Sequence, residues 1–97
     1  MKYNIDVVIC NPNTPKGMNS DICLALTAEF VCDPNQYGNK HFVAIYGEGF
    51  SEQAYDIRYD RSFRRDHKEE WLENWARSYW NGKDGAYTVK RIKIEKI

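Results

Sequence analysis

One stretch, Asp66 to Gly82, reads DHKEEWLENWARSYWNG and constrains the fold more than any other part of the chain. Its apolar residues recur at steps of one, three and four, which places them on one face of an α-helix. They are Trp71, Leu72, Trp75, Ala76 and Tyr79, with Trp80 at the margin of the face. Three tryptophans and a tyrosine offer a large apolar area, so the rest of the chain must supply a surface that covers them.

The ends of this helix also carry recognisable signals. Asp66 and Glu69 have the spacing of a capping box, in which each side chain accepts a hydrogen bond from a free backbone N–H of the first turn. Gly82 follows the last apolar residue, where a left-handed residue would close the helix. Glu73 and Arg77 form a favourable i,i+4 pair on the polar side. The pattern therefore predicts a helix over about residues 66–81.

The composition is that of one globular domain spanning residues 1–97. Hydrophobic residues make up 42% of the chain and charged residues 29%, which excludes a disordered or fibrous protein. No apolar run is long enough to span a membrane, and Asn4 and Asp6 interrupt the N-terminal segment where a signal peptide would be apolar. We therefore expect a cytoplasmic protein without a membrane association.

Two segments in the first half alternate with the period of a β-strand. In residues 3–10 the apolar side chains share one parity, which predicts a strand with one face inward. Residues 21–32, DICLALTAEFVC, fit a strand and also a helical face. We favour the strand, because residues 33–40 suit a hairpin loop and residues 41–46 form a short β-branched and aromatic run. The helix remains the alternative for residues 21–32.

The second half contributes two more predicted strands. After a turn at residues 47–49, residues 54–60 alternate, with Tyr55, Ile57 and Tyr59 on one side. Residues 61–65 connect this strand to the helix and bring Phe63 to the edge of the core. Residues 86–97 predict a final strand whose apolar parity changes near residues 90–91, which indicates a β-bulge there or a change in packing.

These elements predict an α+β fold, which is a mainly antiparallel β-sheet with one amphipathic helix packed on one of its faces. The order of elements is β-β-β-β-α-β. A two-layer domain of this kind buries the apolar stripe of its helix against one face of its sheet. The role of the opposite face is left open by the sequence.

Known cofactor and metal motifs are absent from the sequence. Cys10, Cys23 and Cys32 are odd in number and lack a C-x-x-C spacing, so we expect three reduced, buried thiols rather than disulfides or a zinc site. There is no glycine-rich phosphate loop and no calcium-binding loop. We therefore expect no cofactor, no metal ligands and no catalytic residues.

The most suggestive charged region surrounds the end of the predicted fourth strand and the start of the helix. Arginine guanidinium groups bind carboxylates and phosphates through paired hydrogen bonds, which favours an anionic partner. The alternative interpretation is a solvated strand face with weak ion pairs. The candidate binding residues are Arg58, Tyr59, Arg61, Arg64, Arg65, His67 and Lys68.

Residues Tyr55 to Ile94 resemble short uncharacterised proteins carried by prophages and mobile elements of Gram-positive bacteria. The segments that carry this resemblance are YDIRYDRSF and KEEWLENWARSYWNGKDGAYTVKRIKI. The resemblance implies an accessory protein that binds a host or phage macromolecule. It implies no functional residues.

The sequence favours a small, non-enzymatic protein-binding module that acts through an aromatic and arginine surface, and a homodimer is compatible with it. A nucleic-acid-binding protein is the first alternative, and it would use Arg64, Arg65, Lys68 and the basic C-terminal strand. Balanced charge, with 14 basic and 14 acidic residues, makes nucleic acid the weaker expectation. A small enzyme centred on His67 with Asp60 or Asp66 is the second alternative.

Overall fold

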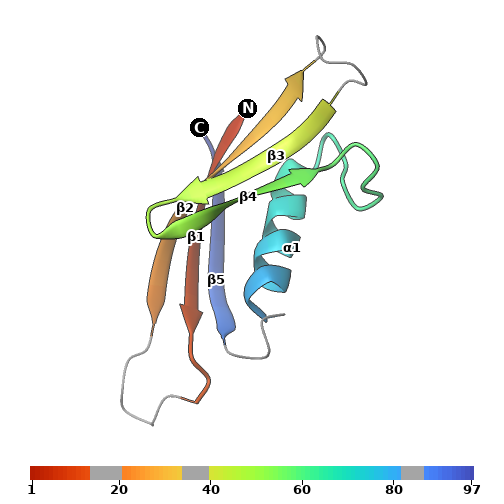
Figure 1. Cartoon of the computed structure of the whole chain (residues 1–97). Helices are drawn as coiled ribbons and strands as arrows, with labels where there is room; N and C mark the ends of the chain where they lie inside the picture. Colours follow the sequence, from red (N-terminus) through yellow and green to blue (C-terminus); the bar gives the residue numbers. More distant parts are fainter. Residues whose placement is uncertain (14–20, 34–39, 82–86) are drawn as a thin grey trace.

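A computed structural model describes residues 1–13, 21–33, 40–81 and 87–97, without the side chains of residues 32, 33 and 40. Its described part contains five antiparallel strands and one helix, which confirms the α+β fold and the predicted order of elements (Figure 1). The strands are β1 (Lys2–Cys10), β2 (Ile22–Asp33), β3 (Lys40–Gly47), β4 (Phe50–Asp56) and β5 (Thr88–Lys96), and the helix is α1 (Lys68–Asn81). Residues 21–32 therefore form a strand, and the helical alternative is wrong.

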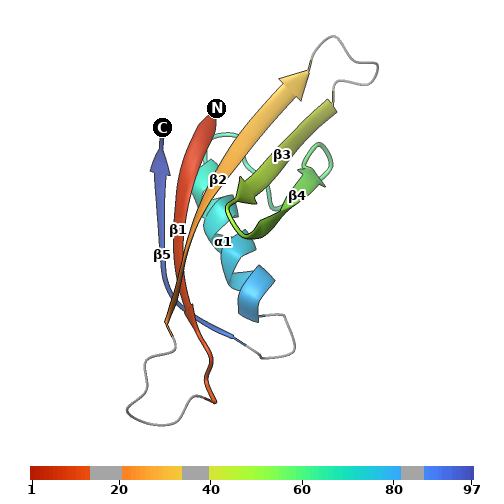
Figure 2. The ribbon, with the colours of Figure 1, turned by 60° about the vertical axis from the view of Figure 1, so that its left-hand side comes forward.

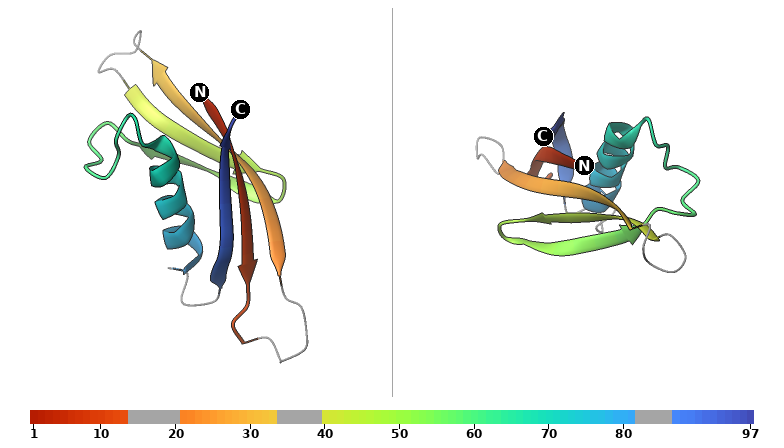
Figure 3. Two further views of the ribbon diagram at one scale, coloured as in Figure 1. Left: turned by 180° about the vertical axis from the view of Figure 1, so that it is seen from behind. Right: turned by 90° about the horizontal axis from the view of Figure 1, so that it is seen from above.

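The sheet has the order β4-β3-β2-β1-β5, so β1 lies between β2 and the last strand of the chain. The inward side chains of β1 are Tyr3, Ile5, Val7 and Ile9, and all four are buried as their alternation predicts. Strongly twisted, the sheet curls around α1, which lies beside β5 and faces β4 across the interior (Figures 2 and 3). Because the sheet wraps the helix, the aromatic stripe meets side chains from both edge strands.

The aromatic residues of α1 form the centre of the core. Trp71, Leu72, Trp75, Ala76 and Trp80 are buried. Trp80 is only 4% exposed, so it lies within the buried face rather than at its margin, whereas Tyr79 is partly exposed and packs against the core from its edge. The ring of Trp80 packs 6.1 Å from Phe50 of β4, a contact that the periodicity of α1 alone does not reveal.

The bulge predicted in the last strand is present. Val8 of β1 pairs with Arg91, but the next residue, Ile9, pairs with Val89, so Lys90 is the extra residue on β5. The extra residue restores Val89, Ile92 and Ile94 to the same inward face, where all three pack against the core. The parity change in the sequence was thus a reliable signal of the bulge near residues 90–91.

The predicted strand at residues 54–60 is wrong at both ends, because β4 covers Phe50–Asp56. It begins early because Gly49 has a φ of 70° and closes a tight hairpin directly after β3. It ends early because the carboxylate of Asp56 accepts a hydrogen bond of 2.9 Å from the backbone N–H of Arg58, which turns the chain. As a result, Arg58, Tyr59 and Asp60 do not lie on a strand face.

The predicted start of the helix at Asp66 is also wrong. The first intrahelical hydrogen bond runs from the N–H of Trp71 to the carbonyl of His67, at 3.2 Å. His67 is therefore the N-cap, and α1 begins at Lys68. The backbone N–H of His67 bonds the carbonyl of Arg64 at 2.9 Å, and this local turn precedes the helix in place of the capping box.

Several further predictions concern residues near the loops. Asn11 accepts a hydrogen bond from the N–H of Asn13, which forms a turn directly after β1; the prolines and glycine of residues 11–17 also predict a surface loop here. The rest of that loop, the hairpin loop over 34–39 and the cap at Gly82 lie outside the described residues. Of the three cysteines expected to be buried, Cys10 is half-buried and Cys23 is exposed, both as free thiols, because their strand positions face away from α1. The side chain of Cys32 lies outside the described part.

Candidate functional site

The segment between β4 and α1, residues 57–67, carries most of the predicted binding residues. Two short turns shape it, and each depends on an aspartate that accepts a hydrogen bond from a backbone N–H two residues later. The Asp56 carboxylate accepts from the N–H of Arg58, and the Asp60 carboxylate accepts from the N–H of Ser62 at 2.8 Å. Because its local hydrogen bonds replace a strand ladder, the segment projects its charged side chains toward solvent.

Asp60 attaches this segment to the helix. One of its carboxylate oxygens accepts from the backbone N–H and the hydroxyl of Ser62, and the other accepts from the indole nitrogen of Trp71 at 3.0 Å. These hydrogen bonds, led by the Ser62 hydroxyl and then the Trp71 indole, hold the pKa of Asp60 below its usual value. Asp60 is therefore a structural anchor, and its oxygens are occupied by the protein itself.

Arg58 and Tyr59 lie together at the outer end of the segment. The guanidinium of Arg58 lies 3.7 Å from the Asp56 carboxylate and 4.5 Å above the ring of Tyr59. Tyr59 is 80% exposed. Both are surface residues, and neither belongs to the lining of the two hollows described below. Arg61 and Arg64 are likewise exposed.

His67 lies at the start of the helix, with its ring nitrogen 4.0 Å from the carboxylate of Glu70. It lines a hollow of about 360 Å³ together with Tyr3, Asp66, Lys68 and two glutamates of the first helical turn. Asp60 is not among the residues around that hollow. Asp66, the other residue that the sequence paired with His67, does lie around that hollow.

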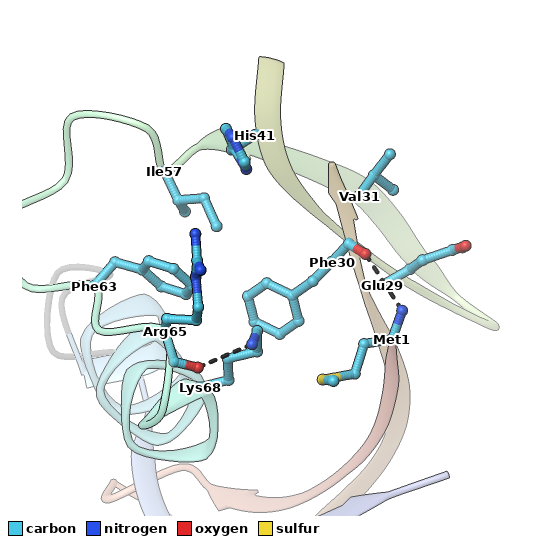
Figure 4. Close-up of a pocket in the computed structure, with 9 residues that line it drawn as sticks. All are labelled: Met1, Glu29, Phe30, Val31, His41, Ile57, Phe63, Arg65 and Lys68. Atoms are coloured by element: carbon cyan, nitrogen blue, oxygen red, sulfur yellow. Dashed lines mark hydrogen bonds between the residues drawn. The ribbon is translucent and has the colours of Figure 1, made fainter. Parts of the chain in front are cut away.

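A larger hollow of about 670 Å³ lies where the ends of β2 and β3 pass the segment 57–67 (Figure 4). We call it the Arg65 groove. Its wall is formed by Phe30, Ile57 and Phe63. The ring centroids of Phe30 and Phe63 are 5.8 Å apart. Both rings also contact Trp71, at 6.4 and 6.3 Å, so the wall is continuous with the core. The complete lining is Met1, Glu29, Phe30, Val31, His41, Ile57, Phe63, Arg65 and Lys68.

Two cations enter the Arg65 groove from the helix side. The ammonium group of Lys68 donates a hydrogen bond of 2.9 Å to the carbonyl of Arg65 and lies 6.0 Å from the centre of the Phe30 ring. The side chain of Arg65 extends along Phe63 toward Ile57 (Figure 4). Among the described residues, no carboxylate lies within ion-pair distance of its guanidinium. Glu29, on the opposite rim, is the groove's carboxylate.

Two of the seven predicted binding residues, Arg65 and Lys68, line the Arg65 groove. Sequence reasoning missed the apolar wall, although Phe63 was expected at the edge of the core and Phe30 shares its strand parity with Leu24 and Leu26 in the predicted strand 21–32. The sequence did not predict the path of the segment 57–67. The strand predicted over residues 54–60 included Ile57, whereas β4 ends at Asp56 and Ile57 lies beside Phe63 in the groove wall.

The basic C-terminal strand is the other predicted cationic surface. It forms the edge strand β5, where Lys90 makes a salt bridge of 3.0 Å to Asp21 and Lys93 one of 3.0 Å to Glu95. Part of its charge is therefore neutralised by neighbouring carboxylates. Lysines on an edge strand also oppose pairing with other strands.

Comparison with known proteins adds no relative: the chain matches no protein family, no curated protein and no solved structure. Among the described residues, no helix is both long and apolar enough to cross a membrane. The same residues contain no group of three or more side chains arranged to hold a metal ion.

Proposed function

We propose that this protein is a non-enzymatic binding module that holds an acidic segment of a partner protein in the Arg65 groove. The observation that carries the proposal is the guanidinium of Arg65, which lies along the apolar wall of Phe30, Ile57 and Phe63 without an ion pair among the described residues. A carboxylate from outside would supply the missing charge.

The physical setting of Arg65 favours a ligand of mixed character. Arg65 is exposed, so its guanidinium is accessible to a carboxylate, with which it can form two parallel hydrogen bonds. The aromatic wall offers contact area to an aliphatic or aromatic side chain beside that carboxylate. The volume of the groove, about 670 Å³, falls within the usual range for binding pockets.

A peptide fits this site better than a nucleic-acid backbone. A phosphate backbone is held by a row of cations, whereas this groove presents the side-chain cations Arg65 and Lys68 beside an apolar wall. The other cations are dispersed, since Arg58 lies beside Asp56 and two of the basic residues of β5 form salt bridges of their own. Together with the resemblance to prophage proteins, this supports an accessory role in the cytoplasm through contact with another protein.

The test is selection of peptides on the purified protein from a displayed library of random 12-residue sequences. We expect the enriched peptides to share an acidic residue beside an aliphatic or aromatic one. Their affinity should fall at least tenfold with Arg65→Glu, because the substitution places a second negative charge against the ligand. Isothermal titration calorimetry with one enriched peptide measures the change.

Arg64→Glu is the matched control, since it makes the same change of charge one residue earlier, at a position that is exposed like Arg65 but lies outside the groove. It should alter the affinity less than twofold. Failure to enrich any peptide, or an equal loss with both variants, would overturn the proposal. Salt-dependent binding of a DNA fragment that both variants weaken equally would favour the nucleic-acid alternative instead.

A further inference from the structure

Strand β2 extends further than the strand beside it. The register of β1 with β2 ends at the pair Lys2 and Glu29. Met1 then closes the ladder, since its carbonyl accepts from the N–H of Phe30 at 2.9 Å and its nitrogen donates to the carbonyl of Phe30 at 3.4 Å. β2 continues to Asp33 and still pairs there with β3, so the two strands project together beyond the start of β1 (Figures 1 and 2).

Among the described residues, the projecting part of β2 pairs with a strand on one side only. The backbone N–H and carbonyl of Phe30 point toward β1, and these directions alternate along a strand, so those of Cys32 point the same way. On its other side Cys32 lies opposite His41 of β3. In the part of the chain that the structure describes, no strand occupies the β1 side of β2 past Phe30. A donor and an acceptor are therefore directed at the position a further strand would take.

This edge borders the Arg65 groove, because Phe30 and Val31 belong to both. Residues that lie opposite each other in antiparallel strands carry their side chains on the same face of the sheet. A residue placed opposite Cys32 would thus project its side chain to the face that Phe30 occupies, which is the face of the groove. Arg65 and Lys68 approach that face from the helix side (Figure 4).

We propose that the acidic segment binds as an extended strand, antiparallel to β2 and in line with β1, and that the residue opposite Cys32 carries the carboxylate that meets Arg65. This proposal rests on the proposed function and names its mode of recognition. The main-chain hydrogen bonds contribute affinity, and the side chain directed into the groove determines which sequence is accepted. Charge decides the occupant: the edge strand β5 of a second copy would bring lysines against Arg65 and Lys68, whereas an acidic peptide complements them.

The experiment uses an enriched peptide and a series in which each backbone nitrogen in turn is methylated. Methylation removes a donor and adds bulk at that position, so we expect an at least tenfold loss of affinity where the nitrogen faces β2 and less than a threefold change at the two neighbouring positions. This period of two identifies a strand. A bound helix or an irregular peptide would give a different pattern and overturn the inference.

A variant of the protein supplies a second, independent measurement. Residues Thr-Val-Thr added before Met1 would continue β1 along the same edge of β2, so they should lower the affinity of the peptide at least tenfold. The same three residues added after Ile97 are the control, because the N–H of Ile97 donates to the carbonyl of Lys2 on the opposite side of β1. This extension should change the affinity of the peptide less than twofold. Equal effects of the two extensions would contradict strand addition.

The two proposals fail in different ways. If Arg65→Glu weakens peptide binding but neither methylation nor the extension before Met1 does, strand addition is wrong and the binding function stands. If no peptide depends on Arg65, both are wrong. If instead the protein alone sediments as a dimer that Arg65→Glu dissociates, the occupant is a second copy and the inference of an acidic partner peptide is overturned.

Discussion

The indole nitrogen of Trp71 donates a hydrogen bond of 3.0 Å to the carboxylate of Asp60, eleven residues earlier in the chain. This bond joins the buried stripe of α1 to the segment that carries Arg65. The wall residue Phe63 lies between the two partners in sequence and packs against the same indole. The shape of the Arg65 groove therefore depends on Asp60, although Asp60 does not line it.

Replacement of Asp60 should destabilise the fold. Asp60→Ala removes the acceptor of the Trp71 indole and both hydrogen bonds from Ser62, so we expect the free energy of unfolding to fall by about 1–3 kcal/mol. Asp60→Asn keeps an oxygen acceptor and should cost less. Urea denaturation followed by tryptophan fluorescence measures both, and an alanine variant as stable as the wild type would contradict this role.

Lowering the pH should remove the stabilisation that the Asp60 carboxylate provides. The pKa of Asp60 is lower in the folded protein than its ordinary value near 4, because the Ser62 hydroxyl and the Trp71 indole stabilise the carboxylate. The stability it provides is therefore fully present above about pH 5 and is lost as the pH falls through the lowered pKa. The difference in unfolding free energy between wild type and Asp60→Asn should shrink between about pH 5 and pH 2. A difference independent of pH would count against this linkage.

Tyr55 should stabilise the helix through its hydroxyl as well as its ring. The indole nitrogen of Trp75 donates a 2.9 Å hydrogen bond to that hydroxyl. Tyr55→Phe retains the ring contacts with Trp71 and Trp75 but leaves the Trp75 donor without its partner, at an expected cost of about 1 kcal/mol. Tyr59→Phe, at an 80% exposed position, is the control and should have no measurable effect in thermal denaturation.

The end of β3 should not tolerate a side chain at residue 47. A Cβ added to Gly47 would lie 2.7 Å from both the carbonyl oxygen of Ala25 and a methyl group of Leu26. Because one of these contacts is backbone, Gly47→Ala should lower the unfolding free energy by about 1–3 kcal/mol. Gly49→Asn tests the neighbouring turn: a Cβ there meets nothing within 4 Å, and asparagine tolerates a positive φ, so a cost well below that of Gly47→Ala is expected.

The groove should be separable from the stability of the fold. Apart from the carbonyl that accepts from Lys68, Arg65 contributes no hydrogen bond or ion pair among the described residues. Arg65→Glu should therefore change the unfolding free energy by no more than about 0.5 kcal/mol. Urea denaturation at neutral pH checks this, and a large loss of stability would mean that the variant cannot serve as a specific test of binding.

Local patterns were sufficient for much of the fold. The buried face of α1 follows from the spacing of Trp71, Leu72, Trp75 and Ala76, and the inward face of β1 follows from its alternation. The bulge at Lys90 was visible because an extra residue shifts the parity of every residue after it. In each case the pattern lies within a single element, so it can be recognised without knowledge of how the rest of the chain folds.

Prediction failed where short-range hydrogen bonds competed with a strand or a helix. The alternation through residues 54–60 continues past the true end of β4, but the carboxylate of Asp56 captures the N–H of Arg58 and turns the chain. At the helix start, a turn between His67 and Arg64 takes the place that the capping box at Asp66 was expected to fill. Such alternatives differ by small free energies, and the surrounding packing selects between them.

The sequence by itself determined the class of the fold, the amphipathic helix and the inward faces of β1 and β5, because these depend on the periods of 3.6 and 2 within single elements. Only the tertiary structure decided that Arg65, Lys68 and the wall of Phe30, Ile57 and Phe63 surround one groove. Those residues come from β2, the segment 57–67 and α1, and their meeting depends on the curl of the sheet and the Asp60 anchor. No local pattern encodes a contact between elements so far apart in the chain.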